Sequence, residues 1–309
     1  MNLSLAFLSL LLPLTTQPPD SSQVLRLNDL GYFEARGLNI LVFNNWYNDL
    51  FSDSKISGIE IIHHGVRTAT NGDVRLNPTP EQWDPIPEFV ERKVNRDTKS
   101  IQALLRYPAY DFSYSVKAEA QDAGIDISVV LEKPIPQSLE GQAGFNLEFL
   151  PSAYFKKAYL IDGRSGFFPL YPDGPMERTN SGSIEPKPIA SGKTLVLSPE
   201  DPARRVTIRS FSGELMLYDG RNKAQNGWFV VRSSLPSKKS GTVMRWFLTA
   251  NMIPGWTRSP VIAYSQVGYH PHQKKVAVIE LDKNDHPLPT ARLLRVRRAE
   301  RRKKSSNQK

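Results

Sequence analysis

The sequence predicts an all-β protein dominated by a large antiparallel β-sandwich. Its 309 residues include 24 Pro and 19 Gly, a frequency of turn residues that favours short strands over long helices. Apolar and polar residues alternate over 112–119 and again over 145–149, which is the period of a half-buried strand. No segment sustains the period of an amphipathic helix, so the strands are expected to pair with one another.

The first domain is expected over residues 20–252. The expected strands are 24–27, 38–43, 59–63, 73–76, 101–107, 111–120, 125–132, 145–149, 194–197, 205–210, 214–218, 228–232 and 243–250. Asn71-Gly72 predicts a hairpin turn before the fourth strand, and Asp122-Ala123-Gly124 predicts another before the seventh. More than ten short strands favour a large sandwich in which early and late strands pair. Trp228 and Trp246 lie within strand patterns and are expected in its core.

An apolar run over residues 3–14 has the length of the hydrophobic region of a signal peptide and is too short to span a bilayer. No Lys or Arg precedes it, and the first basic side chain is Arg26. We expect a signal peptide over residues 1–19, a secreted or periplasmic protein, and no membrane association after removal of the peptide. The alternative is a buried strand or helix. The sequence has no Cys, which excludes disulfides and zinc–thiolate sites.

The formal net charge of +9 is concentrated in one segment. Residues 292–309 hold nine Lys or Arg and one acidic residue, so the rest of the chain has 31 basic and 30 acidic residues. Residues 297–309 are expected to form a basic tail, and blocks of like charge can bind phosphates. Because the body of the chain is balanced, nucleic acid is not expected as a partner.

Residues 253–260, with the sequence IPGWTRSP, are expected to form a linker. A second element follows over 261–296, with strands expected at 276–281 and 291–296. An immunoglobulin-like sandwich needs about 100 residues and seven strands, whereas residues 262–309 supply 48. We therefore expect an incomplete immunoglobulin-like β-sandwich after the first domain.

The opening of this second element carries a family resemblance. Residues 264–271, YSQVGYHP, and then 274–278, KKVAV, resemble the start of the immunoglobulin-like domain that precedes the catalytic barrel in family-nine glycoside hydrolases, the cellulase-type enzymes. The resemblance covers about residues 260–296. Upstream, 145–151 (FNLEFLP) and 162–169 (DGRSGFFP) are similar to the additional β-sandwich that some secreted bacterial members carry.

The resemblance implies a chain without a catalytic residue. In that family an (α/α)₆ barrel holds an Asp-Ala-Gly-Asp segment whose carboxylates activate water, and a late Glu acts as general acid. An inverting glycosidase needs two carboxyl groups far enough apart to admit that water, and no part of this chain has the helical pattern of such a barrel. Asp122-Ala123-Gly124-Ile125-Asp126 resembles the segment with one residue inserted, but we expect a hairpin turn leading into a strand.

The expected role is therefore that of the non-catalytic N-terminal part of a family-nine-like glycoside hydrolase. Its partners would be the catalytic barrel, which it supports, and polysaccharide, which it contacts. After Leu294 the alternation stops and the sequence becomes basic and of low complexity, as a frameshifted or truncated reading frame would produce.

Trp46, Tyr47 and Trp83 are the expected carbohydrate-binding residues. Planar rings with polar edges suit sugar faces, and the first two follow the exit of an expected strand. The pairs His63-His64 and His270-Pro271-His272 each lack an evident third ligand, so no metal is expected. No cofactor is expected either.

Two other functions stay open. A stand-alone carbohydrate-active enzyme would have its site in the first sandwich and would use acids such as Asp111 or Asp162. A nucleic-acid binder would act through residues 292–309, and its binding would depend steeply on salt. The sequence contains no G-x-S-x-G elbow, phosphate-binding loop or dinucleotide fingerprint, so it carries no signature of a stand-alone enzyme.

Overall fold

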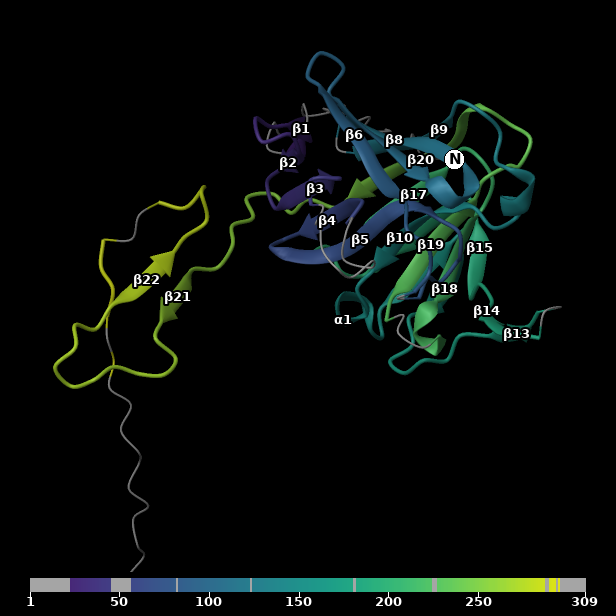
Figure 1. Ribbon diagram of the computed structural model, residues 1–309. Helices are drawn as coiled ribbons and strands as arrows, with labels where there is room; N and C mark the ends of the chain where they lie inside the picture. The colour runs from purple at the N-terminus through teal and green to yellow at the C-terminus, as the bar shows by residue number, and fades with distance from the viewer. Residues whose placement is uncertain are drawn as a thin grey trace, which may run out of the picture. The chain divides into compact units, whose positions relative to one another are not determined.

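The computed structural model describes residues 23–45, 57–81, 83–122, 124–179, 182–223, 227–286, 289–292 and 294, and it confirms the all-β prediction (Figure 1). The chain divides into two compact units between Trp256 and Thr257, within the segment expected to be a linker. The expected signal peptide and basic tail lie outside the described residues. No helix in the described ranges is long and apolar enough to cross a membrane.

The described part of the first unit forms two nine-stranded sheets. The first sheet has the order β1-β2-β3-β4-β5-β10-β19-β18-β15, and its neighbouring strands are antiparallel. Its strands are β1 (Arg26–Leu27), β2 (Phe33–Ala35), β3 (Leu38–Val42), β4 (Ile59–His63), β5 (Val66–Arg75), β10 (Gly144–Phe149), β19 (Phe229–Ser234), β18 (Leu215–Asp219) and β15 (Ala190–Gly192). Strands β1 to β5 form a meander, and β10 joins them to strands from much later in the chain.

The second sheet has the order β12-β11-β16-β17-β20-β9-β8-β7-β6 and is also antiparallel. Its strands are β12 (Arg164–Phe167), β11 (Ala158–Ile161), β16 (Thr194–Leu197), β17 (Val206–Ser210), β20 (Gly241–Ala250), β9 (Gly124–Leu131), β8 (Phe112–Gln121), β7 (Ser100–Tyr107) and β6 (Glu88–Asn95). The other elements named in the described part of the unit are a hairpin, β13 (Met176–Arg178) and β14 (Ile184–Pro186), the helix α1 (Pro151–Tyr154), and the 3₁₀ turns η3 (Pro108–Tyr110), η4 (Gln137–Leu139) and η5 (Gly220–Asn222).

The two sheets enclose one hydrophobic core, and its largest fully buried side chain is Trp246 of β20. The ring of Trp246 meets the ring of Phe145 edge to face at 5.0 Å, and its Nε1 donates a hydrogen bond to Ser233 Oγ at 3.0 Å. Phe145 and Ser233 are opposite one another on the paired strands β10 and β19. One indole of the second sheet therefore fastens two strands of the first sheet, with its N–H satisfied as burial requires.

The hairpin turn expected at Asn71-Gly72 is wrong. The turn between β4 and β5 lies at His64-Gly65, where φ is 50° and 75°, and β5 runs on through Asn71 and Gly72. The β4–β5 register shifts near Ile59, so Asn71, with φ 55°, lies in a bulge. A Cβ on Gly72 would lie 2.5 Å from the Cβ of Ile59. This glycine permits the close approach of two strands and does not form a turn.

The turn expected between β8 and β9 is confirmed, since Asp122 lies in it with φ 49°; Ala123 is outside the described residues. Trp246 lies in the core as expected, but the core position expected for Trp228 is wrong. Trp228 is half-buried just before β19, and its carbonyl accepts a hydrogen bond from Gly220 N at 2.9 Å. It belongs to the loop that enters the strand.

Several strands have no clear sequence signal. Strands β12 to β15 fall in the Gly/Pro-rich segment 163–192 and are only three or four residues long, too short to establish an alternation. Strand β6 is mostly exposed and carries Glu91, Arg92 and Lys93 in a row. It forms an edge of the second sheet, where charged side chains discourage pairing with other chains.

The second unit contains one hairpin in its described part, β21 (Val261–Tyr264) paired with β22 (Ala277–Glu280). Strand β22 falls within the expected strand 276–281, whereas residues 291, 292 and 294 lie in no strand and the rest of 291–296 is outside the described residues. All eight residues of the hairpin strands are exposed. Apolar side chains therefore face solvent on both sides of this small sheet.

Replacing Gly72 with Ala tests the close approach of β4 and β5. We expect Gly72→Ala to destabilise the first unit by about 1–3 kcal/mol, the usual cost of forcing an extra methyl group into a packed site. Gly227→Ala is the matched control, because a Cβ there has no atom within 4 Å. Urea unfolding followed by tryptophan fluorescence reports on the first unit, since all five Trp precede Thr257. Equal midpoints for the two variants would contradict the interpretation.

Candidate functional site

The structure describes one of the three expected carbohydrate-binding residues. Trp46 and Tyr47 lie outside the described residues. Trp83 lies in the connection between β5 and β6, and 74% of its surface is exposed.

The loop that carries Trp83 is held by a neighbouring carboxylate. Asp84 Oδ2 accepts hydrogen bonds from the Glu81 backbone N–H at 2.8 Å and from Asn77 Nδ2 at 2.7 Å. Glu81 Oε1 forms an ion pair with Lys223 Nζ at 3.0 Å, and Lys223 follows the distant turn η5. The exposed indole therefore projects from a fixed backbone.

Asp111 and Asp162, the acids considered for a stand-alone enzyme, are not brought together. Asp111 is exposed and pairs with Arg106 at 3.2 Å. The Asp162 carboxylate is also exposed and accepts hydrogen bonds from the backbone N–H groups of Lys193 and Thr194 at 2.8–3.1 Å, which lower the pKa of Asp162. Strands β7–β8 and β11–β12, which flank the two acids, lie at opposite ends of the second sheet. Each acid stabilises its own turn.

A network of buried charged side chains lies in the middle of the first sheet. Asp73 and Arg75 of β5 are 0% and 7% exposed, and Glu148 of β10 is 3% exposed. The register places Asn146 opposite Asp73 and Glu148 opposite Thr70. Because Asn146 and Glu148 alternate with core residues along β10, these polar side chains lie on the face away from the core. The alternation of β10 predicted a half-buried strand, but both of its faces are buried.

The network begins at the point on β5 where its pairing with β4 ends. The register of β4 with β5 ends at Ile59 opposite Gly72, so the later residues of β5 have no partner on that side. The hydroxyl groups of Tyr107 and Tyr114, from the second sheet, donate to the carbonyl of Val74 at 2.9 and 3.4 Å. Side chains of one sheet thereby replace the missing ladder of the other.

Burial sets the charge state of the acids in this network. Asp73 Oδ1 accepts hydrogen bonds from Tyr114 Oη at 2.9 Å and from Val74 N at 2.7 Å, while Oδ2 has no partner in the described structure. Burial raises the pKa of Asp73 to about 6, and it also raises the pKa of Glu148, although Arg75 opposes both shifts. A proton on Asp73 therefore costs little near neutral pH.

Arg232 of β19 completes the network from the next strand. Its Nη1 donates to Asn146 Oδ1 at 2.7 Å and to the Asn77 carbonyl at 3.1 Å, and its Nη2 donates to the Gln142 carbonyl. Burial lowers the pKa of Arg232 to about 10, which leaves it charged at neutral pH. Asn146 Nδ2 donates to the carbonyls of Asn77 and Pro78 at 3.2 Å. The network thus fixes the start of the loop that displays Trp83.

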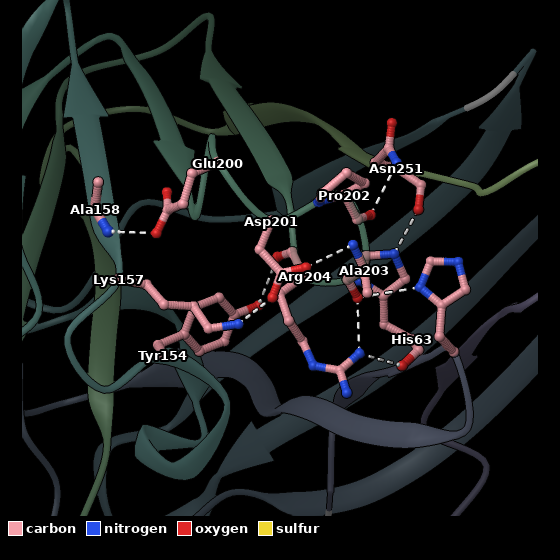
Figure 2. Close-up of polar contacts among 11 residues, drawn as sticks. His63, Tyr154, Lys157, Ala158, Glu200, Asp201, Pro202, Ala203, Arg204 and Asn251 are labelled. Atoms are coloured by element: carbon pink, nitrogen blue, oxygen red, sulfur yellow. Dashed lines mark hydrogen bonds and ion pairs between the residues drawn. The ribbon is translucent and has the colours of Figure 1, made fainter.

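A second polar cluster joins the loop between β16 and β17 to the β4–β5 turn (Figure 2). Arg204 Nη1 donates to the His63 carbonyl at 3.1 Å and to the Ala203 carbonyl at 2.7 Å. Asp201 accepts from the Ala203 backbone N–H at 2.9 Å and forms an ion pair with Lys157. We call this set, together with His64 and Asn251, the polar clamp.

Both imidazoles of the clamp are neutral. His63 Nε2 lies 2.6 Å from the Asn251 carbonyl, which can only accept, so Nε2 carries the hydrogen. Its buried Nδ1 has no partner within the described residues, and burial lowers the pKa of His63 to about 4. His64 Nδ1 likewise donates to the Ala203 carbonyl at 3.1 Å, its Nε2 accepts from Ile253 N at 3.3 Å, and burial lowers its pKa.

The clamp holds the last segment of the first unit. Asn251 Nδ2 donates to the Pro202 carbonyl at 2.8 Å, and the ring of Trp256 lies 5.2 Å from the ring of His64. Arg36 Nε donates to the Trp256 carbonyl at 2.7 Å. The clamp therefore anchors the segment before the unit boundary.

No group of three or more His, Asp or Glu residues that could hold a metal ion occurs within the described ranges. His63 and His64 are stacked at 4.4 Å, but each bonds to backbone. The rings of His270 and His272 lie 5.6 Å apart on the surface of the second unit.

The segment that carries the family resemblance forms the connection between β21 and β22, with a turn at 265–268. Ser265 Oγ donates to the Gly268 carbonyl at 2.8 Å, and Gly268 has φ 86°, a conformation that favours glycine. The hydroxyl of Tyr269 accepts from Ser265 N at 3.2 Å and donates to the Val276 carbonyl. Three residues of the motif therefore close the hairpin, which gives the motif a structural reason.

Compared with models of protein families and with curated proteins, the chain matches no family model and no curated protein.

The neutrality of His63 predicts a loss of stability in acid. Because burial lowers its pKa from 6.5 to about 4, the unfolded chain binds the proton more tightly. The contribution of His63 is present above pH 6.5 and is lost as the pH falls through 4. Between pH 7.5 and pH 5 we expect the wild-type chain to lose about 2 kcal/mol more than His63→Gln, which can still donate to Asn251.

Urea unfolding at the two pH values measures this difference, with His270→Gln as the control because His270 is exposed in the other unit. The control should keep the wild-type pH dependence. If His63→Gln keeps it too, the buried neutral imidazole is not its source.

Asp73 predicts the opposite pH dependence. Its pKa is raised from 3.8 to about 6, so the folded chain binds the proton more tightly. Its contribution to stability is present below pH 3.8 and is lost as the pH rises through 6. From pH 4 to pH 8 we expect Asp73→Asn to gain about 2 kcal/mol relative to the wild-type chain. Asp111→Asn, at an exposed ion pair, should show no such trend in the same urea titrations; a flat difference for Asp73→Asn would argue against a raised pKa.

Proposed function

We propose that this chain is the non-catalytic N-terminal part of a family-nine-like, cellulase-type glycoside hydrolase, which supports a catalytic barrel and contacts polysaccharide. The first unit is a rigid β-sandwich, and the second unit is the opening of the immunoglobulin-like module. In this proposal the protein acts outside the cytoplasm, as a secreted or periplasmic protein.

The observation that carries the proposal is the exposure of the β21–β22 hairpin. Ile262 lies opposite Ile279 and Ala263 lies opposite Val278, on alternate faces of the sheet. Ile262, Ile279 and Val278 are 59%, 43% and 60% exposed. An isolated two-stranded hairpin with apolar side chains on both faces is marginal in water, so this element calls for further packing partners. A module that joins a support to a barrel would provide them.

The positions of Asp122 and Asp126, in the segment similar to Asp-Ala-Gly-Asp, support a non-catalytic role. Asp122 lies in the β8–β9 turn, and Asp126 lies in β9 with 9% exposure. Arg245 Nε and Nη2 both lie 2.7 Å from Asp126 Oδ2, an arrangement that holds β9 to β20. A carboxylate committed to a cross-strand ion pair is poorly placed to activate water.

The buried acids favour one alternative, a stand-alone carbohydrate-active enzyme. Asp73 and Glu148 have raised pKa values, as general acids do. Their contacts with Tyr114 and Asn71 link strands of the sandwich, which favours a structural role. The two functions differ in whether the purified chain cleaves glucan.

We expect the full chain to release no reducing sugar from carboxymethylcellulose or mixed-linkage β-glucan, and to be retained on insoluble cellulose. The proposal assigns this chain a contact with polysaccharide and no catalytic group. Serum albumin serves as the unretained control. Hydrolysis that disappears in Asp73→Asn, with an unchanged circular dichroism spectrum, would establish the enzyme and overturn the proposal. Absence of retention would remove the contact role and leave support alone.

A further inference from the structure

Five exposed apolar side chains of the first unit lie on segments that bond to Arg221 of η5 or to Lys223, the residue after this turn. Ten large apolar side chains of the described first unit are exposed. Five of them are no more than two positions along the chain from a residue that bonds to Arg221 or Lys223. These five are Trp83 (74%), Phe167 (71%), Leu170 (38%), Tyr171 (76%) and Ile184 (53%). We call them the aromatic patch. Such clustering marks an interaction surface more often than scattered exposure does.

Arg221 fixes the segment that carries Leu170 and Tyr171. Its guanidinium pairs with both oxygens of the fully buried Asp219 at 2.8 Å. The remaining donors bond to the carbonyls of Pro169 at 2.9 Å, Leu170 at 2.9 Å and Tyr171 at 3.2 Å. The planar group also lies over the Phe155 and Phe229 rings, at 5.3 and 4.6 Å from their centres.

Lys223 ties two further segments to the same place. Its Nζ lies 3.0 Å from Glu81 Oε1, two residues before Trp83, and 2.6 Å from Glu185 Oε2, next to Ile184. The three side chains are 20%, 33% and 35% exposed. Strands β13, β14 and β18, which flank these residues, lie at one end of the first unit in Figure 1.

The patch therefore combines planar rings with a charged border on a fixed backbone. Glu81 and Glu185 share one Lys, so the border has no excess positive charge and does not suit a polyanion. Carboxylates and an ammonium group supply acceptors and donors for hydroxyl groups, and exposed rings suit the apolar faces of sugars. A pre-fixed surface also loses little conformational entropy on binding.

We propose that the aromatic patch binds a neutral polysaccharide chain, with Trp83 and Tyr171 as the stacking residues. This inference rests on the proposed function, because it locates the polysaccharide contact. Arg221 and Lys223 are positioning residues that hold the two rings.

Retention of the full chain on insoluble cellulose, and its retardation in native gels containing soluble mixed-linkage β-glucan, test the assignment. The test variant is Trp83→Ala/Tyr171→Ala. The control is Phe211→Ala, which removes a ring that is 50% exposed and lies beside Arg209 and Arg245. We expect at least about a tenfold loss of affinity in the double variant and wild-type binding in the control. Circular dichroism confirms that each variant is folded.

The outcomes separate this inference from the proposed function. If the wild-type chain binds and the double variant binds equally well, the patch is not the site, while the polysaccharide contact stands. If Phe211→Ala loses as much affinity as the double variant, binding is not specific to the patch, and the assignment is overturned. If the wild-type chain binds neither cellulose nor β-glucan, the contact role and this inference both fail. The patch would then serve a protein partner.

Discussion

The contact of one indole with the facing sheet organises the first unit. Trp246 lies on β20, in the middle of the second sheet, and reaches Phe145 and Ser233, which are paired across β10 and β19 of the first. A ring of this size contributes a large buried apolar area, and its N–H needs an acceptor once it is away from water. Ser233 supplies that acceptor, so the hydrogen bond sets the register of the two sheets along with the packing.

The second constraint on the fold is the burial of polar groups on the face of the first sheet that points away from the core. On β5 and β10 that face carries Asp73 and Glu148, and both carboxylates are buried. Burying charged groups is unfavourable unless partners compensate. Tyr114, Asn71 and the backbone supply most of the hydrogen bonds, and the pKa of each acid rises because compensation is incomplete. The arrangement gives specificity to the pairing at the cost of a pH-dependent stability.

The sequence was informative wherever local physics decides the structure. Alternation over β8 and the Asp122 turn placed that hairpin, because strand period and turn conformation are local properties. The turn predicted at Asn71-Gly72 is wrong, because Gly72 is required by the close approach of Ile59 from another strand. The burial of Glu148 could not be predicted from the sequence, because alternation of apolar and polar residues does not distinguish a solvated polar face from a covered one.

The candidate site divides in the same way. Trp83 could be named from the sequence as an aromatic residue outside a strand. The sequence could not assign Tyr171 to the same site, because it lies 88 positions further along the chain. The link between their two segments runs through Arg221 and Lys223, whose partners lie far away in the chain. The charged side chains of Arg221 and Lys223 hold chain segments in place, and the rings of Trp83 and Tyr171 on those segments are exposed. The Arg221–Asp219 ion pair is buried and fixes the turn, whereas Trp83 and Tyr171 stay exposed to solvent.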